Sequence, residues 1–265
     1  MPSNITARIK KLEEGLGLSL FTRDRNRLQL TPSGQRLLHY AEQLLALRQQ
    51  ALDELSGDTP GGHLNIGSME SSAAARLPDM LVALHARYAR LQVELATGAS
   101  GIIAQRVLQG ELDVAFVADP PDDARLDRVA LFREELVVVK PPSLADSKGP
   151  ASLPTPLTLV GFTEGCSYRH RLEAWLALGH RKADRIIEIP SYHTMLSCVL
   201  AGMGIAMVPD AVLRLHPAFR ELAQEYPPDD IRHATTYLIW RADSETPAIR
   251  ALVELSREFG NIGAT

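Results

Sequence analysis

The stretch Ser3-Asn-Ile-Thr-Ala-Arg-Ile-Lys-Lys-Leu-Glu-Glu14 decides the architecture at the start of this chain. Ile5, Ile9 and Leu12 recur at the spacing of one helix face, while polar and basic residues fill the other positions. The serine that opens the stretch is a favoured N-cap residue. The stretch therefore predicts a short, basic, amphipathic helix.

Two short strands are expected after this helix, at residues 18–21 and 28–31, once Gly15 and Gly17 have ended it. The turn between the strands, residues 23–27, reads Arg-Asp-Arg-Asn-Arg. A basic helix followed by a basic-tipped hairpin is the order of a recognition helix and its wing. This order indicates the second half of a winged helix-turn-helix.

The charge is distributed unevenly along the 265 residues. The whole chain has a formal net charge of −4, but residues 1–36 carry +4 and the remainder −8. A basic end on an acidic body suits a protein that touches DNA through one small part. Two cysteines are too few for a disulfide framework, and neither a secretory signal nor a membrane-spanning apolar run is evident, so we expect a cytoplasmic protein.

A long helix is predicted over residues 32–55, because Thr31-Pro-Ser-Gly34 offers a threonine N-cap and a proline at the first helical position. Its apolar residues repeat every seven positions and form a heptad seam that contains one arginine, Arg48. The seam predicts dimerisation through Leu38, Ala41, Leu45, Leu52 and Leu55. The alternative is an amphipathic helix packed on its own domain.

The chain beyond the turn-rich linker at residues 56–62 alternates strands and helices, which predicts an α/β body with a parallel sheet. Strands are expected at residues 63–67, 92–96, 113–117, 135–140, 157–162, 185–189, 204–208 and 235–240. Helices are expected at residues 72–88, 100–109, 167–178, 192–201 and 247–259.

Two small α/β lobes are the expected organisation, with chain crossings near residues 140–156 and 209–215. We expect three domains: residues 1–34 (the rest of the winged helix-turn-helix), 35–58 (the linker and dimerisation helix) and 59–265 (the effector-binding domain). Lobe I is expected at about 63–140 and 210–265, and lobe II at about 141–209. Such a pair of lobes binds ligands beyond the carboxyl ends of its strands.

Several motifs resemble those of the LysR-type transcriptional regulators. They are Ile5-Thr-x-x-Ile9-Lys-Lys-Leu-Glu13-x-x-Leu16-Gly-x-x-Leu20-Phe21-x-Arg23, Leu28-x-Leu-Thr31-x-x-Gly34, Leu64-x-Ile-Gly67, Gly110-Glu-Leu-Asp-Val-Ala115 and Gly202-x-Gly204-Ile-x-x-Val208-Pro209. The resemblance implies a winged helix-turn-helix, a dimerising linker helix and an effector domain like periplasmic binding proteins. It also implies a homodimer or homotetramer on double-stranded DNA, a small-molecule effector and contact with RNA polymerase.

The start of the chain departs from the family pattern, in which two helices precede the recognition helix. Here the winged helix-turn-helix is expected to be partial, which would leave Ile5, Ile9 and Leu12 facing water. Two explanations stay open: a misplaced gene start, or a short chain with weakened DNA affinity. The second would make the protein a cytoplasmic effector-binding or partner-modulating module.

The candidate DNA contacts lie on the basic helix and at the wing tip. Asparagine and arginine read base edges, whereas serine, threonine and lysine mostly hold phosphates. By resemblance, early helix positions face bases and the lysines face the backbone, while wing arginines suit the backbone or minor groove. A solvated basic face and a merely soluble turn are the alternatives. The candidates are Ser3, Asn4, Thr6, Ala7, Arg8, Lys10, Lys11, Arg23, Arg25 and Arg27.

The candidate effector contacts lie where the predicted strands end. Hydroxyls and free N–H groups at helix starts can hold an anion, although the same residue types also serve as helix caps. By resemblance, Ser71, Ser100 and Thr163 lie nearest the usual effector position. The candidates are Ser68, Met69, Glu70, Ser71, Ser100, Ala118, Asp119, Phe162, Thr163, Cys166, Ser191 and His193.

Two of these candidates carry hypotheses of their own. Glu70 would repel an anion, so it either selects a cationic or amine-bearing effector or pairs with Arg169 or His193. Cys166 lies at a predicted helix start near Arg169, where its thiol pKa should fall and a redox switch with Cys198 becomes conceivable. The alternative for Cys166 is a small residue that fits a tight turn.

No enzyme motif stands beside these features. The sequence lacks a glycine-rich phosphate loop, His-Glu-x-x-His, Cys-x-x-Cys and Gly-x-Ser-x-Gly, and its eight histidines are scattered without metal-ligand spacing. We therefore expect a regulator with no catalytic residue, no metal and no cofactor.

Overall fold

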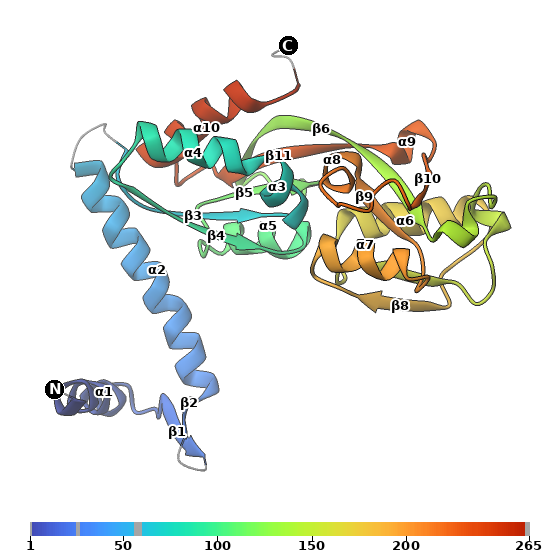
Figure 1. Ribbon diagram of the computed structural model, residues 1–265. Coiled ribbons are helices and arrows are strands. Elements are labelled where there is room, and N and C mark those ends of the chain that lie inside the picture. The colour runs from blue at the N-terminus through green and yellow to red at the C-terminus, as the bar shows by residue number, and fades with distance from the viewer. Residues whose placement is uncertain (1, 25–26, 56–59, 263–265) are drawn as a thin grey trace. The chain divides into compact units, whose positions relative to one another are not determined.

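The computed structural model describes the backbone of residues 2–24, 27–55 and 60–262, and the side chains of residues 5–22, 28–45, 47–48 and 60–262. The chain divides into two compact units, Met1–Ser56 and Gly57–Thr265. Each is described by itself below (Figure 1).

The N-terminal unit contains α1 (Pro2–Leu16), the antiparallel hairpin of β1 (Phe21–Asp24) and β2 (Arg27–Leu30), and α2 (Pro32–Leu55). The helix predicted at 3–14 and that at 32–55 are both confirmed. The strand predicted at 18–21 is wrong, because β1 begins only at the last of those residues. The carboxylate of Glu13 accepts hydrogen bonds from the N–H groups of Leu20 (2.6 Å) and Phe21 (3.1 Å), which holds this segment as a turn.

The start of α2 is fixed by Thr31 and Gly34. The Thr31 hydroxyl accepts from the N–H of Gly34 at 3.0 Å, as an N-cap does, and donates to the carbonyl of Ser19 at 2.7 Å. A Cβ on Gly34 would lie 2.1 Å from the carbonyl oxygen of Leu20. The helix can therefore meet the preceding turn only because this residue is glycine.

The C-terminal unit is built on a seven-stranded sheet in the order β10-β6-β11-β5-β3-β4, with β9 also paired to β6. Its strands are β3 (Gly62–Ser68), β4 (Leu91–Thr97), β5 (Val114–Ala118), β6 (Leu126–Lys140), β9 (Ala206–Pro209), β10 (Ala223–Glu225) and β11 (His233–Arg241). Strands β7 (Thr158–Gly161) and β8 (Arg185–Glu188) form a separate parallel pair. The sheet is mixed, which corrects the parallel prediction: β3 runs parallel to β4 and β5, whereas β11 and β6 run antiparallel to their neighbours.

Helices cover both faces of this framework (Figure 1). They are α3 (Glu70–Ala75), α4 (Leu77–Arg87), α5 (Ser100–Leu108), α6 (Ser167–Leu178), α7 (Tyr192–Leu200), α8 (Asp210–Leu213), α9 (Asp229–Arg232) and α10 (Pro247–Phe259), with 3-10 turns at Pro142–Leu144 and Pro150–Ser152. The predictions at 167–178 and 247–259 match α6 and α10. The helix predicted at 72–88 is wrong as one element, because the chain breaks at Arg76, whose guanidinium reaches Glu134 on β6 at 2.8 and 2.9 Å.

Two lobes with separate cores make up this unit. The lobe I core joins β3, β5 and β11 to α4 and α10, with a smaller cluster under α5. The lobe II core joins β7, β9, α6 and α7 to the second half of β6. Val212, Leu213 and Leu222 pack in lobe II, so residues 210–225 lie there and not in lobe I as expected. The reason is that β6 and β11 are continuous strands that cross between the lobes, so the crossings lie at strand positions instead of loops.

Candidate functional site

A cluster of buried polar side chains lies where the two lobes meet. It draws on α3 of lobe I, α6 of lobe II and the crossing strand β11. Four buried side-chain atoms there form no hydrogen bond of standard distance and angle among the residues that the structure describes: Glu70 Oε2, Ser71 Oγ, Tyr168 Oη and Thr236 Oγ1. Ser71 and Thr236 still lie close enough to the Tyr168 hydroxyl for looser hydrogen bonds that lower its pKa. Buried polar groups are normally hydrogen-bonded, so a group of four that is not points to a binding site.

The effect of Ser71 on the pKa of both Tyr168 and Tyr192 shows that these three side chains are neighbours. Burial raises the pKa of Tyr168 and of Tyr192, and the Ser71 hydroxyl lowers the pKa of each. Thr236 acts on the pKa of Tyr168 in the same direction. The hydroxyls are therefore neutral at physiological pH and can both donate and accept hydrogen bonds.

Glu70 connects the lobes through α7. Its Oε1 accepts a hydrogen bond from the N–H of Tyr192 at 3.4 Å. Burial raises the pKa of Glu70, and this hydrogen bond lowers it by less. Neither Arg169 nor His193 pairs with Glu70 as expected. Arg169 donates to the carbonyl of Phe162 and to the carboxylates of Glu173 and Glu188. The ring of His193 lies 5.0 Å from the ring of His216.

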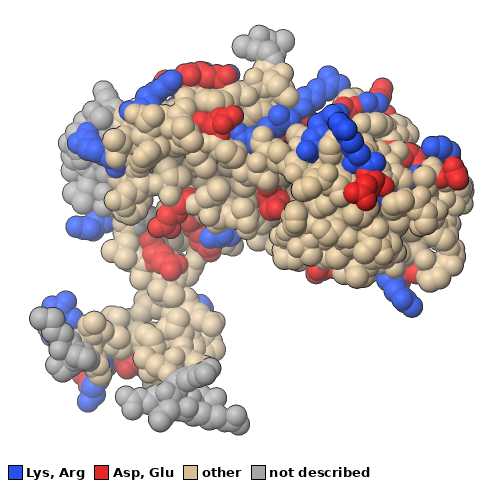
Figure 2. All heavy atoms as spheres, viewed as in Figure 1, with Lys and Arg blue, Asp and Glu red and all other residues tan. Residues whose placement is uncertain are grey.

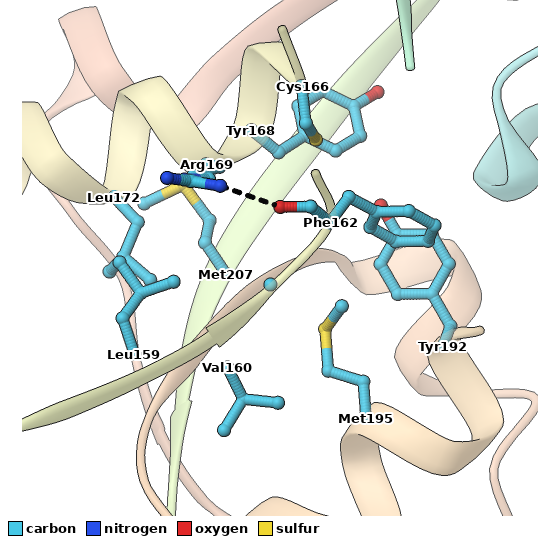
Figure 3. A pocket seen from close by; sticks show the side chains of 11 residues that line it. Leu159, Val160, Phe162, Cys166, Tyr168, Arg169, Leu172, Tyr192, Met195 and Met207 are labelled. Carbon is cyan, nitrogen blue, oxygen red and sulfur yellow. Dashed lines mark hydrogen bonds between the residues drawn. The ribbon is translucent and has the colours of Figure 1, made fainter. Parts of the chain in front are cut away.

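A small cavity borders the cluster on the lobe II side (Figure 3). Its volume is about 10 Å³, which is about the room that one water molecule needs. The rings of Phe162 and Tyr192 meet on its wall with centroids 4.8 Å apart, and Cys166 and Tyr168 also line it. On this side, the cluster therefore has room for about one water molecule.

Cys166 does not have the pKa that its helix position predicts. The residue is the N-cap of α6, and the N–H groups of Arg169 and Tyr168 and the Arg169 charge lower the pKa of its thiol. Burial outweighs them, so the pKa of Cys166 is raised and the prediction of a lowered value is wrong. Cys166 and Cys198 are both free cysteines. The structure therefore favours the reading of Cys166 as a small packed residue.

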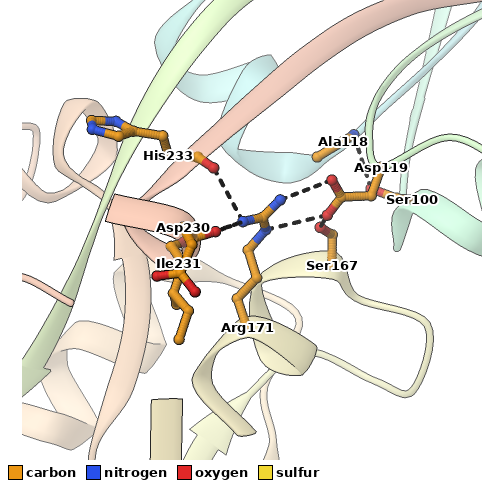
Figure 4. A network of polar contacts seen from close by, with 8 residues as sticks. All are labelled: Ser100, Ala118, Asp119, Ser167, Arg171, Asp230, Ile231 and His233. Atoms are coloured by element: carbon orange, nitrogen blue, oxygen red, sulfur yellow. Dashed lines mark hydrogen bonds and ion pairs between the residues drawn. The ribbon is translucent and has the colours of Figure 1, made fainter. Parts of the chain in front are cut away.

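Asp119 belongs to a polar network that ties lobe I to lobe II (Figure 4). It follows β5 with a positive φ of 48°, and its carboxylate accepts hydrogen bonds from Ser167 and from two nitrogens of Arg171, at 2.9 and 3.2 Å. Arg171 also donates to the carbonyls of Ile231 and His233, beside β11. Burial raises the pKa of Asp119, but the hydrogen bonds from Arg171 and Ser167 outweigh it and lower the pKa overall.

Three of the predicted hydroxyls bond to backbone. Ser68 donates to Met69 O at 2.8 Å, Ser100 accepts from Ala118 N at 3.2 Å, and Ser191 caps α7 by accepting from the N–H of Thr194. The Ser191 contact favours the capping alternative for that residue, whereas Ser68 and Ser100 bond to backbone without capping a helix. Thr163 and His193 are exposed, whereas Met69, Ala118 and Phe162 contribute apolar surface to the lobe II core.

The candidate DNA contacts on α1 lie at the surface of the N-terminal unit. Thr6, Ala7, Arg8, Lys10 and Lys11 are all exposed. Figure 2 shows basic side chains around this helix. The side chains of Ser3, Asn4, Arg23 and Arg27, and all of Arg25, lie outside the described residues.

Apolar side chains of the N-terminal unit are also exposed. On α1, Ile5 is 66% exposed and Leu12 is 48% exposed, as the sequence predicts, while Ile9 is half-buried. On α2, Leu38 is 46% exposed and Leu45 is 63% exposed, with a half-buried alanine at position 41 between them. Leu52 and Leu55 lie outside the described side chains.

Two family descriptions match this chain and together cover nearly all of it. Residues 57–261 match the LysR substrate binding domain, and residues 1–35 match the bacterial regulatory helix-turn-helix protein, lysR family. The chain belongs to the LysR family of transcriptional regulators. The resemblance inferred from the motifs is thereby confirmed, as is the expected class of DNA-binding regulator with an effector-binding domain.

Similar proteins support the assignment to the LysR family over most of their length. The chain is 35% identical over 245 residues to the HTH-type transcriptional regulator YofA of Bacillus velezensis, covering 91% of this chain and 83% of YofA. It is 34% identical over 243 residues to the regulator YusT of Bacillus subtilis, covering 91% of this chain and 81% of YusT. Full-length CbnR, solved with its target DNA, shares the fold with a TM-score of 0.72 at 21% identity, covering 97% and 90% of the two chains.

Membership in the LysR family fixes the broad class of activity. These proteins are transcriptional regulators, so the chain works by binding and not by catalysis. Within the described residues, no group of histidine, cysteine and acidic side chains could hold a metal ion. None of the described helices is long and apolar enough to cross a membrane.

Sequence reasoning missed three residues of the candidate site in this LysR protein: Tyr168, Arg171 and Thr236. Tyr168 directly follows the predicted helix start at Ser167, which could have drawn attention to it. Thr236 reads as one more residue of a buried strand, and no local signal marks it. Its role depends on β11 crossing between the lobes, which a local pattern does not reveal.

Proposed function

We propose that the cluster of Glu70, Ser71, Tyr168 and Thr236 binds a small-molecule effector between the lobes. The observation that carries this proposal is the set of four buried polar atoms that form no hydrogen bond of standard geometry with a described residue. Leaving such a group unpaired costs on the order of 1–3 kcal/mol, so a ligand that pairs with several of them is bound strongly. The candidates that already hydrogen-bond to other residues, Ser68, Ser100, Asp119 and Ser191, would shape the site without contacting the ligand.

The switching mechanism follows from the origin of the four groups. Ser71 comes from lobe I, Tyr168 from lobe II and Thr236 from the crossing strand β11. A ligand that contacts all three binds one arrangement of the lobes better than another, and this difference alone allows it to shift the equilibrium. In an oligomer, the linker helices would pass this shift to the spacing of the DNA-binding domains, DNA bending and contact with RNA polymerase.

DNA recognition is assigned to α1 and the wing. Asn4 and Arg8 would read base edges in the major groove, whereas Lys10, Lys11 and the wing arginines would hold phosphates. Such contacts make the affinity for DNA fall steeply with salt concentration. A protein that acts on chromosomal DNA would work in the cytoplasm.

Oligomerisation is assigned to the heptad seam of α2. The exposed side chains of Leu38 and Leu45 lie seven residues apart on this helix, with Ala41 between them. A second copy of the helix would remove this apolar seam from water. The resulting homodimer or homotetramer would present paired recognition helices to successive major grooves.

The experiment is a promoter-binding assay by fluorescence anisotropy, with and without the small-molecule fraction of an extract from the source cells. The full wild-type chain should bind promoter DNA and change its affinity when the extract is added. Ser71→Ala and Tyr168→Phe should keep DNA binding and lose at least tenfold of the response to the extract.

Tyr226→Phe is the matched control, because this tyrosine is exposed and lies under the guanidinium of Arg232, away from the cluster. It should respond as the wild type does. An undiminished response in both cluster variants would place the effector elsewhere. A wild-type chain that binds no promoter DNA would contradict the assignment of α1 and the wing.

A further inference from the structure

We propose that the effector carries a protonated amine, which Glu70 recognises. The inference rests on the proposed interlobe effector site and names the class of ligand that the site takes. The ligand class follows from the free acceptor atoms of the site and from the negative charge of the Glu70 carboxylate, which no described cation pairs with.

The free oxygen of Glu70 is the first observation. Glu70 is the first residue of α3, and the N–H of Tyr192 occupies its Oε1 at 3.4 Å. Its Oε2 is buried and accepts no hydrogen bond from any described residue. A carboxylate oxygen only accepts hydrogen bonds when ionised, so the complementary ligand group is a donor.

The neighbouring hydroxyls fit the same group. Ser71 Oγ, Tyr168 Oη and Thr236 Oγ1 are buried and form no hydrogen bond of standard geometry with a described residue, and each has lone pairs that can accept a hydrogen bond. An ammonium group offers three donors and no acceptor. One carboxylate oxygen together with hydroxyl acceptors can receive all three donors.

The cations around the site are already engaged, which argues against an anionic ligand. The guanidinium of Arg76 contacts Glu134, that of Arg169 contacts Glu173 and Glu188, and that of Arg171 contacts Asp119. A carboxylate or phosphate entering the cluster would find none of these arginines free and would face the Glu70 carboxylate.

The aromatic walls are compatible with a cation. The rings of Phe162 and Tyr192 lie with centroids 4.8 Å apart at an interplanar angle of 59°, and Tyr192 is the residue whose N–H binds Glu70. The faces of aromatic rings attract cations. An amine held by Glu70 would therefore lie beside favourable aromatic surface.

The experiment measures binding by calorimetry at pH 7 to the full chain, with three families of probes that share one carbon skeleton. These are primary amines, the corresponding alcohols and the corresponding carboxylates, built on linear chains of two to six carbons and on the benzyl group. At least one amine should bind, and its alcohol and carboxylate counterparts should bind at least tenfold more weakly.

Variants at Glu70 then test the recognising group. Glu70→Gln should weaken binding of the amine at least tenfold, and Glu70→Asp, which keeps the charge, should retain the preference for amines. Glu94→Gln is the matched control, because this glutamate is exposed on β4. It should leave the affinity for the amine within twofold of the wild type. A thermal melt of each variant first establishes that it is folded.

The inference is overturned if no amine of the panel binds, if the alcohol or carboxylate binds as tightly, or if Glu70→Gln retains the affinity for the amine. A failure of the proposed function looks different. In that case, a probe of any class binds, but Ser71→Ala and Tyr168→Phe leave its affinity unchanged.

Discussion

Glu70 carries a conflict between stability and binding at the scale of a single residue. Burial raises the pKa of its carboxyl above the ordinary value of 4.5, with partial compensation from the N–H of Tyr192. The folded protein therefore holds a proton at Glu70 more tightly than the unfolded chain does. The ionised form destabilises the fold, as expected for a group kept for binding.

We predict that Glu70→Gln raises the melting temperature at pH 7, because it removes a carboxylate that is unfavourable in the folded state. Each kcal/mol of change in the free energy of unfolding shifts the melting temperature by about 2–4 °C in a protein of this size. The wild type regains stability as the pH falls from the raised pKa towards 4.5, so the advantage of the variant should disappear at and below that pH. Melting curves at pH 7 and pH 4 measure this difference. An equal gain at both pH values would show that the carboxylate charge is not responsible.

Cys166 yields a prediction about reactivity. Because burial raises its pKa, little thiolate is present at pH 7, and its reaction with a disulfide reagent should be slow. In the variant Cys198→Ser, which leaves Cys166 as the remaining cysteine, the native protein should react at least tenfold more slowly than the protein unfolded in guanidinium. A native rate as fast as the unfolded one would restore the redox hypothesis.

At the scale of elements, local signals predicted helices well and strand boundaries less well. Helix α2 begins where the Thr31 cap predicts, because the hydrogen bond that starts it joins residues three apart. Strand β1 begins late, because Glu13 on α1 holds the N–H groups of Leu20 and Phe21. The break between α3 and α4 likewise depends on Arg76 meeting Glu134 on a strand far along the chain.

Gly34 gives a prediction at this scale. In Gly34→Ala, the new Cβ would lie 2.1 Å from the carbonyl oxygen of Leu20, so the start of α2 would have to move away from the turn. Overpacking of this kind costs about 1–3 kcal/mol, and we expect the N-terminal unit to unfold more easily and to lose affinity for DNA.

The control for Gly34→Ala is Gly15→Ala, where nothing lies within 4 Å of the new Cβ and alanine favours the helix. Circular dichroism during urea unfolding and promoter binding by anisotropy measure the two effects. Equal stability and affinity in both variants would contradict the close packing of α2 on the turn.

At the scale of the whole effector-binding unit, the network around Arg171 joins the lobes. Arg171 lies on α6 of lobe II and contacts Asp119 after β5 of lobe I, together with the carbonyls of Ile231 and His233 beside the crossing strand β11. A guanidinium that bonds to both lobes and to a crossing strand resists their separation. The angle between the lobes therefore depends on this network as well as on any ligand.

We predict that Arg171→Gln lowers the free energy of unfolding of this unit by about 2 kcal/mol. A hydrogen bond to a charged group contributes about 1.5–3 kcal/mol. The lower part of that range applies because the Asp119 side chain is half-exposed to solvent. The pKa of Asp119 is lowered from its ordinary value of 3.8 in the folded protein. The ion pair with Arg171 therefore stabilises the fold at pH values above 3.8, and this stabilisation is lost as the pH falls through the lowered pKa. The variant and the wild type should therefore converge in strong acid.

Urea unfolding at pH 7 and at acid pH measures this difference. Arg125→Gln is the matched control, because Arg125 forms an exposed pair with Asp123 and exposed pairs contribute little. A loss in Arg125→Gln as large as that in Arg171→Gln would show that joining the lobes is not what stabilises the protein.

The sequence by itself determined the family, the basic surface helix, the long linker helix and the helices α6 and α10, because caps, glycines and a period of 3.6 act over a few residues. Only the tertiary structure decided that β6 and β11 cross between the lobes and make the sheet mixed, and that residues 210–225 join lobe II. It also brought Tyr168 and Thr236 to Glu70 and Ser71. These outcomes depend on pairing between strands distant in the chain, and on burial that reverses local electrostatic expectations, as at Cys166.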